Sequence, residues 1–197
     1  YVQKAIALLK KSDLFSNINI NTLNQSIKTL QNWDFNTNAS NPNAALPILS
    51  FSSILDTDPV KITNEILIKN ITQAINHLEK YYNKIDVKWG EINRLIRGEN
   101  NLELSGGPDV ARAIYSIPQD NQGQLKSIAG DCYILLARWD ENGKVFSESI
   151  HQYGSATTNA NSVHYDNQAK VYANETSEKF GCISQECTRT LKRIQSS

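Results

Sequence analysis

The chain has 197 residues, with 20 basic and 20 acidic side chains and a hydrophobic fraction of 40%. These values are typical of a globular protein, and a chain of this size buries roughly 70% of its unfolded surface. A nucleic-acid-binding protein usually carries a clustered basic excess, whereas Lys and Arg are scattered here. No apolar run approaches the roughly 18–20 residues of a membrane helix. We therefore expect a domain with its own core, no nucleic-acid partner and no membrane span.

The chain contains no Met and begins at Tyr1, so we expect a processed chain or a recombinant fragment of a longer protein. A signal peptide could have been lost with the missing front. The start of the sequence therefore does not define the compartment.

The three cysteines fall in two settings. Cys132 lies in an apolar, strand-like run and is predicted to be an inert core residue. Cys182 and Cys187 form either a small disulfide loop in an oxidising compartment or two free thiols. The histidines are not spaced to complete a zinc site with this pair, so we predict no metal site.

The first third of the chain is predicted to be helical. Apolar residues from Val2 to Leu9 fall on one face of a helix. A second helix is expected to begin at Thr22, because Thr22 and Gln25 have the spacing of a capping box, and to end at Trp33.

The strongest helical pattern runs from Ile62 to Tyr82, where apolar residues recur every three or four positions. Before it, residues 44–55 form a short apolar segment interrupted by Pro47. After it, a shorter helix is predicted over 89–97, with Gly98 as its C-cap.

The second half of the chain is predicted to be rich in strands. Consecutive apolar residues over 133–137 indicate a strand covered on both faces. Asn142-Gly143 predicts a tight turn with positive φ angles, followed by a return strand over 144–150. Either helices sandwich this hairpin, or it belongs to a larger sheet. A closing helix is expected near 184–194.

These elements predict an α/β protein of the α+β type, with helices packed on antiparallel strands. We expect a helical segment over 1–100 and a strand-rich segment with a closing helix over 101–197, in one structural unit.

Several motifs occur in order along the chain. The first block is Lys88-Trp89-Gly90-Glu91-Ile92-Asn93-Arg94-Leu95-Ile96-Arg97-Gly98, then Leu104-Ser105-Gly106-Gly107-Pro108-Asp109-Val110-Ala111-Arg112-Ala113. The second is Gly130-Asp131-Cys132-Tyr133 with the Trp139-Asp140 hairpin, then Ser149-Ile150-His151-Gln152-Tyr153-Gly154-Ser155-Ala156 and Ser162-Val163-His164-Tyr165-Asp166-Asn167-Gln168. From about Thr22 to Gln168 the chain resembles the penicillin amidase family. The Arg-Leu-x-Arg-Gly and His-Gln-Tyr-Gly-Ser forms resemble the branch acting on long acyl chains, such as acyl-homoserine lactone and aculeacin acylases.

The resemblance implies an N-terminal-nucleophile hydrolase with an αββα sandwich. In such enzymes a precursor cleaves itself, and the freed Ser attacks an amide with its own α-amino group as base. Tyr1 cannot perform this chemistry, and the family's nucleophile and catalytic Asn and Arg lie earlier than the matched segments. We therefore predict no catalytic, cofactor-binding or metal residue in this chain, and no cofactor. The chain is expected to be the C-terminal part of the large chain, and to be inactive alone.

The same resemblance implies the partners. They are the small chain and the N-terminal part of the large chain, together with an acylated small molecule such as an antibiotic or a quorum-sensing signal. The enzyme would remove the acyl group from an amine-bearing head group. It implies maturation in the periplasm or outside the cell, which suits a Cys182–Cys187 disulfide.

Two other functions remain open from the residues alone: an independent binding module, or a hydrolase with its own triad. The triad would take Ser149 or Ser155 with His151, His164 and Asp166. No Gly-x-Ser-x-Gly nucleophile elbow is present. The plainer interpretation is that the 164–166 segment hydrogen-bonds to lock a loop.

Three further polar residues have alternative interpretations. Arg94 and Arg97 could grip a carboxylate bidentately, or pair with Glu91, Glu99 or the missing part of the protein. His77 is predicted to be solvated on the polar side of its helix.

Overall fold

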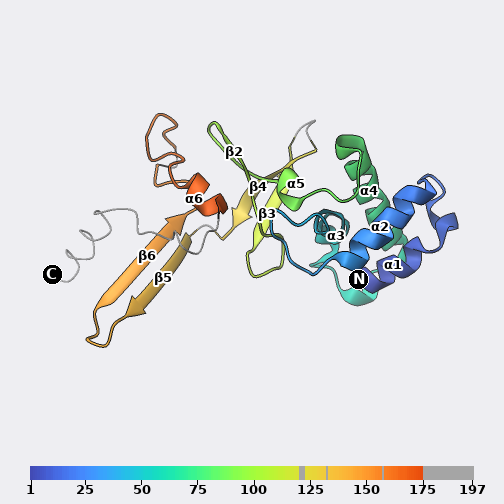
Figure 1. Ribbon diagram of the computed structural model, residues 1–197, viewed down its shortest axis with the longest axis horizontal. Helices are drawn as coiled ribbons and strands as arrows, with labels where there is room; N and C mark the ends of the chain where they lie inside the picture. Colours follow the sequence, from blue (N-terminus) through green and yellow to red (C-terminus); the bar gives the residue numbers. More distant parts are fainter. Residues whose placement is uncertain (120–122, 132, 157, 175–197) are drawn as a thin grey trace. The chain divides into compact units, whose positions relative to one another are not determined.

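The computed structural model describes residues 1–119, 123–131, 133–156 and 158–174. It divides into two compact units. Unit 1 comprises Tyr1–Arg94 and Glu103–Gly130, and unit 2 comprises Leu95–Leu102 and the chain from Asp131 onward. Helices and mixed sheets occur together (Figure 1), which confirms the α+β class. Among the described helices, none is both long enough and apolar enough to cross a membrane.

Unit 1 contains a helical core. Its helices are α1 (Val2–Leu9), η1 (Ser12–Phe15), α2 (Ile20–Asn32), α3 (Ala45–Phe51), η2 (Ser52–Ile54), η3 (Pro59–Lys61), α4 (Asn64–Tyr82) and α5 (Trp89–Ile92). On α4, Leu67, Ile71, Ile75 and Leu78 are completely buried and share one face. They pack with apolar side chains of α1, α2 and α3 in a single cluster. The predicted helices over 2–9 and 62–82 are confirmed.

Two local predictions in these helices are wrong. The cap of α2 is Asn19, whose side chain accepts a hydrogen bond from the Thr22 N–H at 2.9 Å, so the predicted capping box at Thr22 does not start the helix. The Thr22 hydroxyl instead donates to Glu79 at 2.5 Å. Pro47 does not interrupt its segment, because it lies in the first turn of α3, where backbone N–H groups have no partner within the helix.

The predicted helix over 89–97 is also wrong. Only Trp89–Ile92 is helical, and strand β1 (Asn93–Arg97) follows directly. The switch occurs at Asn93, whose carbonyl accepts from the Leu104 N–H at 3.0 Å. Gly98 has φ +56°, as predicted for a C-cap, but it serves in the turn between β1 and β2 (Asn100–Glu103).

Two further strands belong to unit 1. Strand β3 (Ile114–Pro118) pairs antiparallel with β4 (Leu125–Gly130), with a register shift between Tyr115 and Ser116. The beginning of β1 pairs in parallel with β4, with Asn93 opposite Leu125. The strand order is β2-β1-β4-β3.

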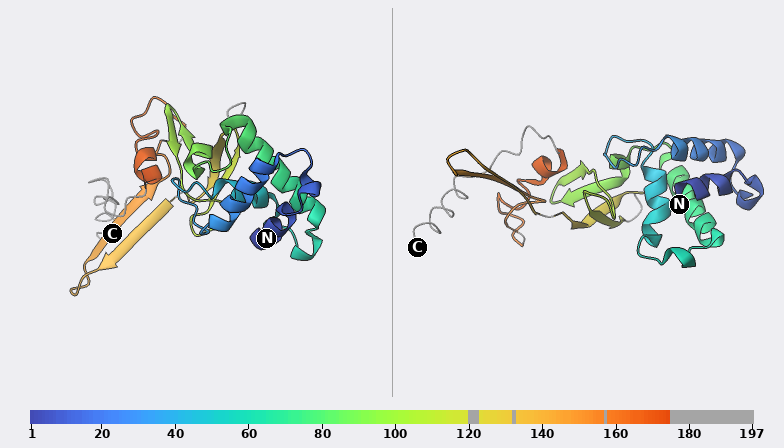
Figure 2. Two further views of the ribbon diagram at one scale, coloured as in Figure 1. Left: turned by 45° about the vertical axis from the view of Figure 1, so that its right-hand side comes forward. Right: turned by 90° about the horizontal axis from the view of Figure 1, so that it is seen from below.

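Unit 2 contains the predicted hairpin. Strands β5 (Tyr133–Trp139) and β6 (Val145–His151) pair antiparallel from Tyr133 opposite His151 to Trp139 opposite Val145 (Figure 2). The turn differs from the prediction, because only Gly143 has a positive φ, of +77°. The Asp140 carboxylate accepts from the Asn142 and Lys144 N–H groups at 2.9 Å each, so a type I-like turn with a left-handed Gly replaces the two-residue turn.

The hairpin is not covered on both faces, contrary to the prediction. Tyr133, Leu135 and Trp139 are 51%, 53% and 66% exposed. Helix α6 (Ala169–Asn174) packs on β6, and Ile150 is buried there.

Three predictions fall outside the described residues: the core position of Cys132, the state of the Cys182 and Cys187 pair, and the closing helix over 184–194. The segment boundary at residue 100 stays a prediction.

Candidate functional site

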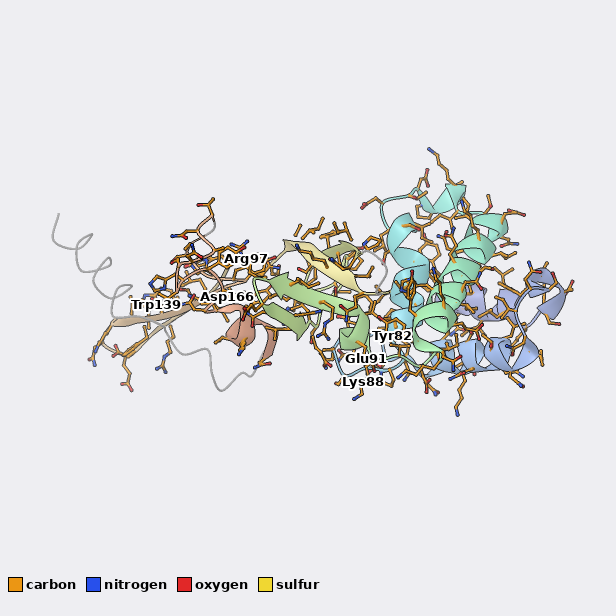
Figure 3. All side chains as sticks on the ribbon, turned by 90° about the horizontal axis from the view of Figure 1, so that it is seen from above. Tyr82, Lys88, Glu91, Arg97, Trp139 and Asp166 are labelled. Atoms are coloured by element: carbon orange, nitrogen blue, oxygen red, sulfur yellow. The ribbon has the colours of Figure 1, made fainter. Side chains whose placement is uncertain are left out.

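The motif residues of unit 2 meet around Arg97. The Arg97 guanidinium stacks 3.8 Å from the centroid of the Tyr165 ring and 4.8 Å from that of Tyr153. Its Nε also donates a long hydrogen bond of 3.5 Å to the Tyr165 carbonyl. Arg97 and Asp166 lie in the same part of unit 2 (Figure 3), where Asn100 donates to the Asp166 carboxylate at 2.5 Å. We call Arg97, Asn100, Tyr153, Tyr165 and Asp166 the Arg97 cluster.

The turn between β1 and β2 fits against this cluster because residue 98 is Gly. A Cβ atom on Gly98 would lie 3.2 Å from the Asp166 carboxylate and 3.4 Å from the Tyr165 ring. The positive φ of Gly98 is a second reason for Gly at this position. Arg97-Gly98 and Tyr165-Asp166, which lie far apart in the sequence, therefore contact each other.

Hydrogen bonds between further motif residues hold the loop after β6 in place. The Gln168 N–H donates to the Tyr153 carbonyl, and the Gln168 side chain accepts from the His151 N–H, both at 2.7 Å. The Ala156 N–H donates to the His164 carbonyl at 3.1 Å. The bond to the His164 carbonyl, with that from the Tyr165 N–H to the Ser162 carbonyl at 3.0 Å, agrees with the prediction that the 164–166 segment hydrogen-bonds to lock a loop.

Burial and charge act in opposite directions on Tyr153. Desolvation raises the pKa of the Tyr153 phenol, and the nearby Arg97 charge lowers it by a smaller amount. The phenol therefore stays neutral at physiological pH, and the contact with Arg97 is a cation–π interaction, not an ion pair.

A polar hollow of about 740 Å³ opens beside the cluster in unit 2. It is lined by Gly98, Glu99, Asn100, Ala160, Tyr165, Asp166, Asn167 and Lys170. Its carboxylates, amides and amine can hydrogen-bond, but it presents no hydroxyl or thiol nucleophile other than the Tyr165 phenol. Among the described residues, no group of three or more His, Cys, Asp or Glu side chains could hold a metal ion.

A second motif network lies in unit 1, around Trp89 and Asn93. The Trp89 indole donates to the Gly106 carbonyl at 2.6 Å. Asn93 is completely buried, donates from Nδ2 to the Leu104 carbonyl at 2.9 Å, and accepts from the Ser116 hydroxyl at 2.7 Å. The Trp-Gly block and the Gly-Gly-Pro block are thus joined by buried hydrogen bonds.

The end of α4 carries a third polar contact in unit 1 (Figure 3). His77 Nε2 and the Tyr82 hydroxyl both hydrogen-bond to the Gly123 carbonyl, at 2.8 and 3.1 Å. Burial raises the pKa of Tyr82 to about 12, the Glu91 charge adds to this rise, and the Arg94 charge opposes it. His77 is partly buried and bonded, so the prediction of a solvated His77 is wrong.

The two predicted arginines have different partners. Arg94 donates to the Gly90 carbonyl at 2.7 Å, whereas Arg97 belongs to the cluster described above. Glu91 forms an ion pair with Lys84, with 3.5 Å between Nζ and Oε1.

The recorded contacts do not join the residues of the possible Ser-His-Asp triad. The His151 ring stacks 5.0 Å from the Tyr133 ring, and His164 Nδ1 lies 3.4 Å from the Asn167 amide. Among the described residues, no recorded hydrogen bond joins either His to Ser149 or Ser155.

Sequence reasoning missed the stacking role of Tyr153 and the contribution of Asn100. Both stand within or beside quoted motifs, so their presence was visible but their contacts were not. Asn93 carried a usable signal, since a polar residue between apolar Ile92 and Leu95 must find partners if it is buried.

The model of the penicillin amidase family matches residues 2–186. The chain therefore belongs to the penicillin amidase family, a family of amide-hydrolysing acylases. A search of curated proteins gives no match.

Proposed function

We propose that this chain is the C-terminal part of the large chain of an amide-hydrolysing acylase, where it supports the active site without supplying the nucleophile. The observation that carries this proposal is the Arg97 cluster. Four of its five members lie in motifs that resemble the family and Asn100 lies beside one, and Arg97, Asn100 and Asp166 are engaged within the cluster and with the backbone.

The network in unit 1 supports the same role. Trp89 and Asn93 use their polar atoms on backbone carbonyls and on Ser116. Buried groups bonded in this way hold backbone segments in place, because breaking one bond leaves an unsatisfied partner. They are positioning residues for an enzyme whose chemistry takes place elsewhere in the polypeptide.

The reaction in this proposal is removal of an acyl group from an amine-bearing head group. An N-terminal Ser of the large chain attacks the amide, with its α-amino group as base, and needs no metal or organic cofactor for the chemistry. The Arg-Leu-x-Arg-Gly and His-Gln-Tyr-Gly-Ser forms favour a long acyl chain. The remainder of the acylase is the partner, and the periplasm or the cell exterior is the compartment.

The test uses the complete protein that contains this chain, with dodecanoyl-homoserine lactone and other acyl amides as substrates. We expect Ser155→Ala and His164→Ala to retain hydrolysis. Arg97→Ala is expected to lower the amount of soluble, active enzyme while leaving the KM of the remaining enzyme unchanged. Arg97→Lys is the matched control, since Lys keeps the charge but loses the planar stacking surface.

Two results would contradict the proposal. One is loss of kcat in a well-folded Ser155→Ala or His164→Ala enzyme, which would favour a triad within this chain. The other is an Arg97→Ala enzyme with normal yield and stability.

A further inference from the structure

The sequence contains one Asn-Gly pair, Asn142-Gly143, and the structure places it in the turn between β5 and β6. The chain from Ala137 to Phe146 is exposed at every residue. The turn lies at the end of the hairpin away from α6 (Figure 1). Water and dissolved base therefore reach both residues of the pair.

The Asn142 side chain is free to react with the backbone that follows it. Among the described residues its carboxamide has no recorded hydrogen bond, whereas its backbone N–H donates to the Asp140 carboxylate at 2.9 Å. Beyond its chain neighbours, no atom lies within 4 Å of a Cβ built on Gly143. Because Gly has no side chain, nothing shields the Gly143 nitrogen from the Asn142 carboxamide carbon, Cγ.

Other bonds of the turn oppose such a reaction. The Gly143 N–H donates to the Asp140 carbonyl at 3.0 Å, and the Asp140 carboxylate holds the N–H groups of Asn142 and Lys144. Attack on Cγ requires the Gly143 nitrogen to leave its acceptor and turn toward the side chain. Solvent-exposed bonds at the end of an element open locally at low cost. The turn therefore slows the reaction without preventing it.

We propose that Asn142 is a site of spontaneous deamidation, which adds a negative charge and alters the backbone at the hairpin turn. The Gly143 nitrogen attacks Cγ of Asn142. The N–Cγ bond forms, the Cγ–Nδ2 bond breaks, and the Gly143 proton, relayed through water, leaves with Nδ2 as ammonia. The intermediate is a cyclic imide.

Water then opens the imide at one of its two carbonyl carbons. Cleavage of the new N–Cγ bond gives aspartate at position 142. Cleavage of the bond between the Gly143 nitrogen and the main-chain carbonyl carbon of residue 142 gives isoaspartate, in which the chain continues through the side chain. One water is consumed and one ammonia is released, so the reaction needs no oxidant, reductant or enzyme.

The one Asn-Ser pair of the chain, Asn161-Ser162, provides an internal reference in the same unit. Asn161 is also exposed. However, the Ser162 N–H donates to the Asn159 carbonyl at 3.1 Å, and the Ser162 hydroxyl accepts from the His164 N–H at 3.2 Å. Ser162 also has a Cβ that crowds its nitrogen. We therefore expect Asn142 to react many-fold faster than Asn161.

The two products change the turn differently. Aspartate adds a third acidic group next to Asp140 and Glu141, and the repulsion is weak because all three positions are exposed. Isoaspartate also lengthens the backbone by one methylene group, so the N–H groups that Asp140 holds are no longer spaced for it. The adjacent pair of the register, Trp139 with Val145, is then less restrained. This inference is independent of the proposed function, because it uses only the hairpin turn.

The first experiment follows the modification in the complete protein, incubated in mildly alkaline buffer made with heavy-oxygen water. Trypsin cleaves after Arg138 and Lys144, and the peptide Trp139–Lys144 has Asn142 as its one amide side chain. Mass spectrometry is expected to find conversion of this amide to an acid carrying one heavy oxygen, several-fold faster than at Asn161. Electron-transfer fragmentation should identify isoaspartate as the main product, whereas direct hydrolysis of the amide gives only aspartate.

Three variants test the role of the turn. Asn142→Gln keeps the carboxamide but needs a six-membered ring, so conversion should fall many-fold. Asp140→Ala removes two of the bonds that restrain the turn and should raise the rate at Asn142 several-fold. Glu141→Ala, at an exposed neighbour whose side chain has no recorded bond, is the matched control and should leave the rate unchanged.

The second experiment measures hydrogen exchange in fresh protein, aged protein and Asn142→Asp. We expect faster exchange over residues 139–145 in the aged protein, and little change in Asn142→Asp, which adds the charge without lengthening the backbone. Exchange in α4 should be the same in all three samples, which excludes general unfolding.

Three outcomes overturn the proposal. These are conversion at Asn142 no faster than at Asn161, aspartate without isoaspartate, and an Asp140→Ala rate that is equal to or below that of the parent protein. Circular dichroism of each variant ensures that a change in rate is not caused by loss of the fold.

Discussion

The helical core of unit 1 and the β5–β6 hairpin of unit 2 are built from similar apolar residues but bury them to very different extents. On α4, Leu67, Ile71, Ile75 and Leu78 are completely buried, whereas Leu135 on β5 is 53% exposed. The helical core of unit 1 is covered by that unit's own elements, whereas the described part of unit 2 leaves Leu135 and its odd-numbered neighbours on the hairpin exposed. An apolar sequence pattern therefore predicts that a surface is buried, but it does not indicate which element of the structure covers that surface.

The largest expected difference between the two regions is in the free energy of unfolding. Leu67→Ala should lower it by about 2–5 kcal/mol, because the truncation leaves a cavity in a packed core. Leu135→Ala should lower it by only about 1 kcal/mol, because about half of that side chain is still in water. Urea unfolding of the two variants measures both values. Equal losses would break the comparison.

The buried side chain of Asn93 tests the contribution of polar contacts to the stability of unit 1. Asn93→Ala is expected to cost about 1–3 kcal/mol, because the Leu104 carbonyl and the Ser116 hydroxyl lose a buried partner. Asn142→Ala, at the exposed hairpin turn, should stay within about 0.5 kcal/mol of the parent protein. Thermal unfolding of both variants separates the two sites. A neutral Asn93→Ala would argue against the buried network.

Two glycines with positive φ test the contact between the β1–β2 turn and the Arg97 cluster. Gly143→Ala, with no atom within 4 Å of the added Cβ, should cost about 1 kcal/mol from backbone strain alone. Gly98→Ala has the same strain and also crowds Asp166 and Tyr165, so its cost should be about 1 kcal/mol larger. Equal costs in equilibrium unfolding would mean that the turn and the cluster are not in contact.

The smallest expected effect is a pH dependence in unit 1. The pKa of Tyr82 is raised to about 12 in the folded chain and is near 10 when unfolded. The corresponding stabilisation is fully present below pH 10 and is lost as the pH rises toward 12, because the unfolded state releases its proton first. Since Tyr82 is only partly buried, solvent screening reduces the effect to about 1 kcal/mol. Unfolding of the parent and Tyr82→Phe proteins at pH 9 and 11.5 measures it, and an identical pH slope would contradict it.

The sequence predicted elements well where periodicity and burial agree. The helix over 62–82 has four completely buried residues on one face, and the hairpin is flanked by clear turn residues. It failed at Asn93, where apolar Trp89, Ile92 and Leu95 have helical spacing but hydrogen bonds between Asn93 and Leu104 impose a strand. Such tertiary pairing has no local signature.

The candidate site was predictable as a set of motifs but not as a geometry. Arg97 and Tyr165 stood out separately, and nothing in their spacing indicated that a guanidinium would stack on two tyrosine rings. The exposure of the hairpin was also missed, because an apolar run predicts burial without indicating which element provides it.

The central claim, that the reactive Ser lies outside these 197 residues, can be tested by covalent labelling. The complete acylase is treated with a long-chain fluorophosphonate, which reacts with activated serine hydroxyls, and the labelled peptide is identified by mass spectrometry. We predict a single labelled Ser at the start of the large chain, outside these 197 residues, and loss of amide hydrolysis in proportion to labelling. Stoichiometric label on Ser149 or Ser155, with the same loss of activity, would contradict it.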